Sequence, residues 1–399
     1  MEHLECVFCN RHYSLNIFNP FCPDCREPLL FPIVTREEKI LFDKSESLEK
    51  FINFLPIEQL DQNLFLGEGN TPLLPLQNLM SKFDLPLLYA KDESRNPTLS
   101  FKDRGTAVAI QKAVSLNISK IGTVSVGNMA SSTAAYGAKA GLKTYVFVEE
   151  AVSQEKLLST CIYNPFLIQV KGDYGNLFEK SFSIGKKHDI YFMNSVDPFR
   201  IEGYKLAGLE TFIQLGQKAP KYVFVPVSSG GHLIGLMKAF RDLKSRNLIQ
   251  EIPKFIGVQA DRCSPLAKAY RSGKFSFERI RNPQPIPYAI CNPNPPGGNI
   301  VLKWIRQNNG IITDVSDEEI FHAQRLLAEY EGIFCLPASA ATLAGFLKLS
   351  KNLDLTQNNT TVLVLTGSGL KGLKLLNISK TRIFHSTIST LEHTIRQIV

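Results

Sequence analysis

The sequence predicts an α/β protein with parallel sheets and a small N-terminal metal-binding ribbon. Two observations lead to this prediction. Apolar, β-branched or aromatic runs alternate with helix-like stretches through most of the chain, and four of the eight cysteines fall within the first 25 residues. Strands that alternate with helices form parallel sheets covered by helices on both faces. The chain therefore combines an enzyme-sized α/β body with a small separate unit.

Length and composition describe an ordinary globular chain. It has 399 residues, of which 44% are hydrophobic and 21% charged, so its apolar surface can offset the entropy of folding. This length allows two or three domains. No apolar run approaches the roughly 20 residues of a membrane-spanning helix. The first ten residues lack the basic and apolar regions of a secretory signal, so we expect a cytoplasmic protein with no membrane partner.

The net charge of +8 leaves the partner open. A basic surface can hold nucleic acid, but it suits a phosphorylated small molecule equally well. Basic residues occur in short patches, such as 186–187 and 241–246, and aromatic residues do not interleave with them in any one segment. Stacking platforms for bases are therefore not evident. A non-enzymatic nucleic-acid-binding protein is the less favoured alternative.

The N-terminal cysteines have metal-ligand spacing. Cys6 and Cys9 form one C-x-x-C pair, Cys22 and Cys25 form a second, and twelve residues separate the pairs. Two such knuckles can turn four thiolates toward one tetrahedral Zn²⁺. Two disulfides and chance clustering are the alternatives, but a reducing cytosol argues against the first and the paired spacing against the second. We therefore predict a structural zinc ribbon.

The body can be divided into elements from its apolar runs. The predicted buried strands are 87–90, 121–126, 144–148, 166–170, 222–227, 255–258 and 361–365. The predicted helices between them include 104–115, 131–140, 174–187, 201–215 and 235–244. A charged connector at 35–62 precedes them, and a proline-rich loop at 281–298 interrupts them. Because ligands bind at the carboxyl ends of strands in open α/β sheets, the residues after each strand are candidate site residues.

The first candidate follows the strand at 87–90. Ser100 is predicted to cap the next helix, which places Lys102 in its first turn. The helix dipole disfavours a cation there, so the lysine loses basicity, which suits Schiff-base chemistry. A solvated lysine paired with Asp103 or Glu93 is the other interpretation.

Turns of small residues follow three further strands. Residues 125–132 open a helix with Asn128 near its N-terminus. Residues 226–232 read Pro-Val-Ser-Ser-Gly-Gly-His, and the backbone N–H groups of such a loop can cradle a phosphate, although it could also be an ordinary tight turn. Residues 366–371 form the third turn. Together with a reactive lysine, these features are what an aldehyde cofactor with a phosphate group requires.

With these motifs in this order, the chain resembles the fold type II pyridoxal-phosphate enzymes, and within them the threonine synthases. The likeness extends from about Gly67 to Lys371. It includes Gly-Glu-Gly-Asn-Thr-Pro-Leu at 67–73, Asn-Pro-Thr-Leu-Ser-Phe-Lys-Asp-Arg-Gly at 96–105, and Asn-Ser-Val-Asp-Pro-Phe-Arg-Ile-Glu-Gly at 194–203.

The resemblance implies a tryptophan synthase β-like architecture of two parallel-sheet α/β domains. The large, cofactor-binding domain would comprise 36–117 and 195–399, and the small mobile domain 118–194. Several family members also carry an N-terminal zinc ribbon, which agrees with the unit expected at 1–35. A homodimer is the expected assembly.

The resemblance also implies a role for each motif. Lys102 would be the catalytic Schiff-base residue, Asn128 would meet the phenolic oxygen of the cofactor and Thr366 its pyridine nitrogen. The residues expected to bind pyridoxal 5'-phosphate are Lys102, Asn128, Ser228, Ser229, Gly230, Gly231, His232 and Thr366. The residues expected to bind substrate are Ser125, Met129, Ser131, Asn194, Ser195 and Arg200, of which the last three suit its phosphate.

The sequence departs from the family pattern at three places. The phosphate loop reads Ser-Ser-Gly-Gly-His where Gly-Asn-Gly-Gly-Asn is common, which changes a side-chain contact but keeps the backbone donors. Met129 stands where threonine is common, and Leu99 replaces the usual glycine before Ser-Phe-Lys.

The implied reaction is the conversion of O-phosphohomoserine and water to threonine and phosphate, with Lys102 moving protons at Cα and Cβ. Two alternatives use the same fold: a cysteate synthase-like replacement on phosphoserine with sulfite, and a threonine or serine dehydratase. A small phosphorylated amino acid is therefore the expected partner.

Overall fold

The protein was analysed as a computed structural model. The structure describes residues 3–33, 47–150, 152, 154–281, 290–356 and 359–375, together with 386, 388, 392, 395 and 396. The first part of the predicted connector, up to residue 46, and residues 282–289 of the predicted loop lie outside the described residues.

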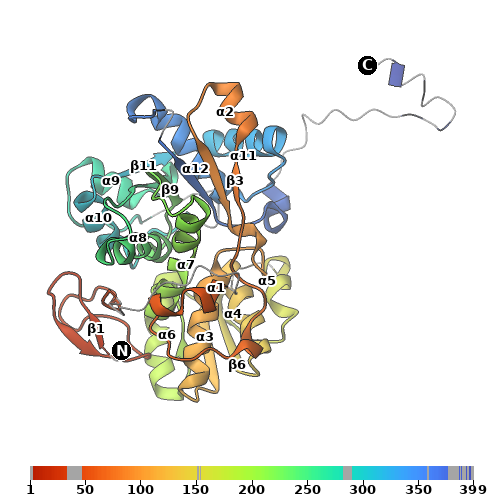
Figure 1. The fold of residues 1–399 in the computed structure, drawn as a ribbon. Helices are drawn as coiled ribbons and strands as arrows, with labels where there is room; N and C mark the ends of the chain where they lie inside the picture. The colour runs from red at the N-terminus through yellow and green to blue at the C-terminus, as the bar shows by residue number, and fades with distance from the viewer. Residues whose placement is uncertain are drawn as a thin grey trace.

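A six-stranded sheet forms the upper body of the protein (Figure 1). Its strand order is β11-β10-β9-β12-β4-β3, and every pair is parallel except β3 with β4. The strands are β3 (Leu73–Pro75), β4 (Leu88–Asp92), β9 (Tyr222–Pro226), β10 (Lys254–Ala260), β11 (Ile311–Val315) and β12 (Thr361–Leu365).

Helices cover both faces of this sheet because its strands are apolar on both sides. On β9, Tyr222 and Phe224 belong to one core, whereas Val223 and Val225 belong to another. Successive strand residues point to opposite faces, so a continuous apolar run needs a layer on each side. One face carries α7 (Pro198–Gln214), α8 (Gly231–Ser245) and α10 (Gly298–Gln307), and the other carries α11 (Asp317–Glu331) and α12 (Pro337–Leu349).

A four-stranded sheet lies in the lower part of Figure 1, with the order β7-β6-β5-β8 and all pairs parallel. Its strands are β5 (Lys120–Val124), β6 (Lys143–Glu149), β7 (Phe166–Val170) and β8 (Tyr191–Phe192). The helices in this part are α3 (Lys102–Ser115), α4 (Asn128–Lys139), α5 (Gln154–Cys161) and α6 (Tyr174–His188). Because α3 contacts both α4 and α7, it connects the lower part to the upper body.

The N-terminal unit is a small ribbon in which β1 (His3–Glu5) pairs antiparallel with β2 (His12–Ser14). The remaining α-helices are short: α1 (Ser47–Lys50), α2 (Gln77–Phe83) and α9 (Pro265–Arg271).

The fold class is confirmed, and all seven predicted strands occur within two residues or so of their predicted limits. Among the described residues, the prediction missed five strands: β1 and β2 of the ribbon, and β3, β8 and β11 of the two sheets. Of the last three, β3 and β8 have only three and two residues, and polar Thr313 and Asp314 interrupt the apolar pattern of β11. The proposed domain boundaries remain a prediction. None of the helices in the described ranges is long and apolar enough to span a bilayer.

Candidate active site

A large cavity of about 2060 Å³ opens at the carboxyl ends of strands from both sheets. Its wall includes residues that follow β4, β5, β6, β9 and β12. The predicted site residues on this wall are Lys102, Ser125, Asn128, Met129, Ser131, Ser195, Ser228, Ser229, Gly230, Gly231, His232 and Thr366. The structure therefore brings most of the predicted site together in one place.

Lys102 is the first residue of α3. Its Nζ lies 4.4 Å from the centre of the Phe101 ring and 5.7 Å from the centre of the Tyr204 ring. Burial lowers the pKa of Lys102 to about 7, and the positive charge of Arg200 acts in the same direction. The amine is therefore unprotonated in a large fraction of molecules at neutral pH, as a nucleophile or base must be. Burial is the main cause of this pKa shift, in place of the helix dipole that the sequence suggested.

The prediction that Ser100 caps α3 is wrong. The helix begins after Phe101 with no side-chain cap, and the Ser100 hydroxyl has no hydrogen-bond partner in the described part of the chain. Ser100 instead forms a backbone bridge with Gly367, next to which the Ser368 N–H donates to the Leu99 carbonyl at 3.1 Å. This pairing joins the lysine segment to the turn after β12.

Leu99 has a φ of 61°, in the left-handed region that favours glycine. The left-handed backbone angle at residue 99 explains why glycine is the usual residue before Ser-Phe-Lys in the family pattern. The leucine side chain lies on the cavity wall and is 37% exposed, so the substitution gives the site an apolar contact at the cost of backbone strain.

Asn128 is the first residue of α4, directly after Gly127. The first-turn N–H groups of a helix attract anions, and this turn lies on the cavity wall. Ser131 is one turn further on, with its Oγ 3.0 Å from that of Ser159, and buried Met129 packs beside it on the wall. The arrangement suits a carboxylate or a phenolic oxygen.

The loop before α8 allows a close approach of its backbone to a ligand. Gly230 has a φ of 93°, and a Cβ there would lie 3.0 Å from the backbone of Gly297. A Cβ on Gly231 would collide with the carbonyl oxygen of Ser195. Helix α8 begins at Gly231 and has 15 residues, and its first turn lies on the cavity wall, where the free N–H groups of a helix terminus attract an anion. A helix N-terminus of this kind can bind a phosphate.

His232 is the second residue of α8 and is 7% exposed. Its ring stacks on Phe101 with centroids 3.8 Å apart, and neither ring nitrogen has a hydrogen-bond partner among the described residues. Burial lowers the pKa of His232 well below its ordinary value, and the charges of Lys102 and Arg104 add to this. The imidazole is therefore neutral, and its two buried nitrogens belong to a residue that lines the cavity.

The turn after β12 supplies Thr366, whose Oγ1 lies 3.0 Å from the Ser339 hydroxyl. Its backbone carbonyl accepts a hydrogen bond from the N–H of Phe101 at 3.1 Å. Sequence reasoning gave no role to Lys371 of the same turn, although it too lies on the wall. Burial lowers the pKa of Lys371 to about 8, and its Nζ donates to the carbonyl of Thr98 at 2.7 Å.

The structure does not bring Asn194 and Arg200 to the cavity wall. The Asn194 amide accepts a hydrogen bond from the N–H of Val124 at 2.9 Å and donates to Ser181 at 3.0 Å. Arg200 is fully buried and donates to Met193, to Thr106 and, at 2.5 Å, to Thr133. By contrast, Ser195 lies on the wall and its hydroxyl has no partner in the described ranges.

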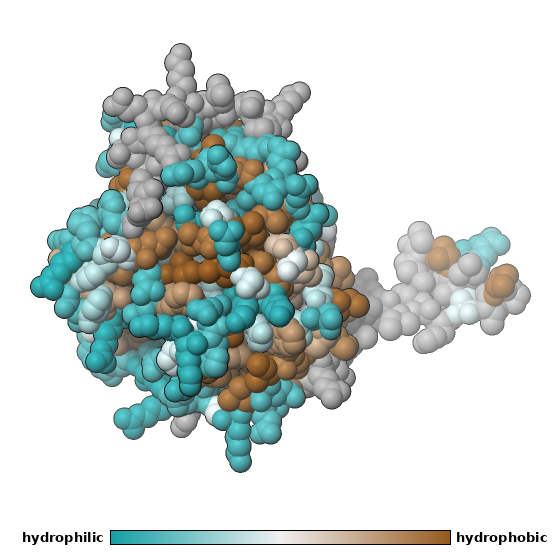
Figure 2. Space-filling view, turned by 90° about the horizontal axis from the view of Figure 1, so that it is seen from below, coloured by the Kyte–Doolittle hydropathy of each residue, from teal (hydrophilic) through white to brown (hydrophobic). Residues whose placement is uncertain are grey.

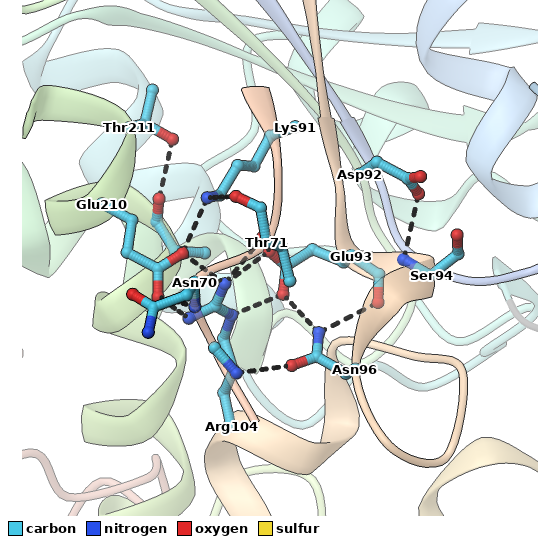
Figure 3. Close-up of polar contacts among 12 residues, drawn as sticks. Asn70, Thr71, Lys91, Asp92, Glu93, Ser94, Asn96, Arg104, Glu210 and Thr211 are labelled. Atoms are coloured by element: carbon cyan, nitrogen blue, oxygen red, sulfur yellow. Dashed lines mark hydrogen bonds and ion pairs between the residues drawn. The ribbon is translucent and has the colours of Figure 1, made fainter. Parts of the chain in front are cut away.

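A buried ionic network that the sequence analysis did not assign supports the lysine segment (Figure 3). Arg104 donates to Glu93 at 2.5 Å and to Glu210 at 2.7 Å, and Lys91 donates to Glu210 at 2.7 Å. The Thr71 hydroxyl, from the first motif, donates to Glu93 at 2.7 Å. In the sequence, the only sign of this network is a group of charged residues beside a buried strand. The contribution of Glu210 from α7 becomes visible only in the fold.

The four N-terminal cysteines fit a zinc ion. Their ligand atoms all lie within 4.8 Å of one another, and the Sγ atoms of Cys9 and Cys22 are 3.8 Å apart. Zn–S bonds of about 2.3 Å in a tetrahedron place sulfur atoms about 3.8 Å apart. Cys6 and Cys25 complete the set, as their spacing predicted.

Comparisons with known proteins agree with this arrangement. The profile of the family described as "Pyridoxal-phosphate dependent enzyme" matches residues 64–367. The threonine synthase of Methanocaldococcus jannaschii is 34% identical over 374 residues, 92% of each chain. That of Halalkalibacterium halodurans is 36% identical over 325 residues, 81% of this chain and 89% of the relative.

Two solved structures share the architecture. A threonine deaminase from T.th. has a TM-score of 0.62 and 25% identity, covering 79% of this chain and 94% of that one. The diaminopropionate ammonia lyase of Escherichia coli has a TM-score of 0.65 at 18% identity, covering 78% and 87%. At that identity, the second likeness shows the fold alone.

Proposed function

This chain belongs to the pyridoxal-phosphate-dependent enzymes and, within them, to the threonine synthases, and from that premise we propose that it converts O-phosphohomoserine and water to threonine and phosphate. The observation that carries the proposal is the position of Lys102, a lysine with a pKa of about 7 on the wall of a cavity that also contains the N-termini of α4 and α8. Such a cavity can hold two anionic groups beside one reactive amine.

The residues present fit pyridoxal 5'-phosphate. The cradle at Gly230 and Gly231 would hold its phosphate, Lys102 would bind its aldehyde carbon, and Asn128 and Thr366 would meet its ring. When bound, the cofactor supplies an electron sink for the charge that develops beside Cα of the amino acid. The unpartnered ring nitrogens of His232 would offer one further hydrogen bond at the phosphate end.

Lys102 is suited to move protons in the reaction. A group with a pKa near the working pH can accept a proton in one step and return it in another. The amine would take the proton from Cα and transfer protons at Cβ, so that phosphate leaves from Cγ and water adds at Cβ.

Ser195 is our candidate for contact with the substrate phosphate, because the residue lies on the wall and its buried hydroxyl has no partner among the described residues. Arg200 would contribute from behind the wall: its charge already lowers the pKa of Lys102, and the same charge favours a bound anion. Asn194 would hold the Ser195 segment against β5 through the N–H of Val124.

The deciding experiment measures phosphate release by the purified holoenzyme. O-phosphohomoserine alone is expected to release phosphate and yield threonine. Release from phosphoserine only when sulfite is added would instead identify a cysteate synthase-like enzyme. Ammonia and a keto acid from free threonine or serine, without phosphate release, would identify a dehydratase.

We also propose a cytoplasmic homodimer. Four thiols in metal-ligand positions suit a reducing compartment. Exposed apolar surface supports an oligomer, and Figure 2 shows such surface among polar side chains on the lower face. The exposed apolar side chains of the described residues include Leu158, Ile162 and Phe166. Light scattering after size-exclusion chromatography tests the assembly, and a mass of 44.6 kDa would show a monomer.

A further inference from the structure

The second cysteine knuckle, residues 19–27, forms part of the wall of the active-site cavity. Phe21, Cys22, Arg26 and Glu27 all line the cavity that contains Lys102. The ribbon is therefore not a remote appendage. Its metal-binding turn lies on the wall of the cavity that contains Lys102.

One side of this knuckle contacts helix α6. The Phe21 ring meets Phe182 edge-to-face with centroids 5.3 Å apart, and it lies 6.5 Å from Phe178. Phe178 and Phe182 are themselves 5.2 Å apart, and both line the cavity. Three aromatic rings thus join the ribbon to the helix that packs on β5 and β8 of the four-stranded sheet.

The other side of the ribbon is fixed to α10 of the upper body. Glu27 accepts a hydrogen bond from the Asn299 side chain at 2.6 Å, and Lys303 donates to the carbonyl of Val7 at 2.6 Å. The Lys303 ammonium also lies 4.9 Å from the centre of the Phe8 ring. Just before α10, the N–H of Gly297 donates to the carbonyl of Ser229 in the phosphate loop at 2.9 Å.

We propose that the ribbon is a positioning element of the active site, in which the metal-fixed knuckle spans the cavity mouth from α10 to α6 and Phe21 holds α6 in place for substrate binding. A segment this short has little core of its own, so the bound metal fixes the shape that presents Phe21. Metal occupancy then sets how firmly α6 is held. The proposal rests on the proposed function only for the choice of substrate.

The test compares Phe21→Ala with Phe8→Ala in the zinc-loaded, cofactor-loaded enzyme. Both substitutions remove a half-buried ring from the ribbon, but Phe21 faces α6 and Phe8 faces Lys303 of α10. Phe21→Ala is expected to raise the amide hydrogen exchange of α6 and to raise KM for O-phosphohomoserine roughly three- to tenfold, the effect of one aromatic contact, with kcat little changed. Phe8→Ala is expected to change both quantities much less, because the Asn299–Glu27 and Lys303–Val7 hydrogen bonds still hold the ribbon to α10.

Metal removal supplies an independent arm of the test. Chelation should raise α6 exchange in the wild type but not further in Phe21→Ala, because the contact is already lost there. If Phe21→Ala does not retain zinc, Phe182→Ala removes the same contact from the other side. The proposal is overturned if α6 exchange and KM are the same in Phe21→Ala and Phe8→Ala. Failure to turn over O-phosphohomoserine would refute the proposed function, while the exchange measurement would still decide the role of the ribbon.

Discussion

Arg104 and Glu210 lie 106 residues apart in the sequence, yet their side chains form two hydrogen bonds of 2.7 Å in the protein interior. This pair joins α3, which begins with Lys102, to α7 (Figure 3). Burial alone would raise the pKa of Glu210, but the charges of Arg104 and Lys91 outweigh it and hold that pKa far below its ordinary value. The network therefore fixes the direction in which the lysine segment leaves β4.

Glu210→Gln should lower the free energy of unfolding by about 3 kcal/mol, because it leaves Lys91 and part of Arg104 buried without a counter-charge. Urea unfolding followed by circular dichroism measures this. The matched control is Asp354→Asn, which breaks the exposed Lys221–Asp354 pair and should leave the free energy nearly unchanged. Equal, small effects of the two substitutions would contradict a stabilising role for the network.

The wild-type contribution of Glu210 should also depend on pH. A depressed carboxyl pKa gives stability that is fully present above the unfolded-state pKa and is lost as the pH falls through the acid range. Below about pH 4, the free energy of unfolding of Glu210→Gln should therefore decrease less steeply with falling pH than that of the wild type.

Lys102 should capture the cofactor with an unusual pH dependence. Only the unprotonated amine attacks an aldehyde, and the pKa of Lys102 is lowered to about 7. Reconstitution of the apoenzyme with pyridoxal 5'-phosphate, followed by absorbance, should reach half its maximal rate near pH 7. Lys102→Ala should give no chromophore that borohydride fixes to the chain. A rate that continues to rise above pH 9 would show an ordinary lysine.

His232 should stay neutral where other histidines titrate. The chain has seven histidines. We expect the imidazole NMR signals of His232 to stay constant between about pH 5 and 8, the range in which an ordinary histidine titrates. Because its pKa is lowered on folding, the unfolded chain binds more protons below about pH 6.5, and stability is lost as the pH falls. His232→Phe keeps a ring against Phe101 and should reduce this loss by up to about 1.4 kcal/mol per pH unit. An unchanged slope would mean that His232 is protonated in the folded state.

Leu99→Gly should stabilise the protein by about 1 kcal/mol, since it removes a left-handed backbone angle that costs a non-glycine residue about that much. Leu99→Ala keeps the strain and should give no such gain. Differential scanning calorimetry on the two variants separates backbone strain from loss of the side chain. Equal melting temperatures would show that strain at this turn is negligible.

Ser195→Ala should raise KM for O-phosphohomoserine about tenfold or more, because a hydrogen bond to a charged group is worth about 1.5–3 kcal/mol. Arg200→Gln should instead raise the pKa seen in cofactor capture, because it removes the charge that lowers the pKa of Lys102. It should also lower the stability, because the Arg200 donors bind Met193, Thr106 and Thr133. If only the Arg200 substitution raises KM, the arginine rather than the serine contacts the substrate.

Much of the site could be predicted because its residues follow strands. Asn128, Gly230 and Thr366 each come just after a buried strand, Lys102 lies at the end of the segment that follows β4, and parallel strands bring their carboxyl ends together. Arg200 shows the limit of this reasoning. The motif that contains Arg200 resembles the family pattern. Whether a side chain in the first turn of a helix reaches the cavity or the core depends, however, on its neighbours in the fold, and Arg200 binds Thr106 and Thr133 in the core.

Contacts between distant segments were out of reach for a similar reason. Nothing near Phe21 in the sequence indicates α6 as its neighbour, and nothing near Arg104 indicates Glu210. Ser100 was mistaken for a cap because its type suits one, whereas the backbone pairing with Gly367 depends on a turn far along the chain.

The absence of room for a Cβ at Gly230 and Gly231 also bears on how related chains can be recognised. The neighbouring positions can change their side chains while the backbone still presents the same donors. A search pattern that requires asparagines in this loop would therefore overlook a working cradle, whereas one that requires only two adjacent glycines between a buried strand and a helix would retain it.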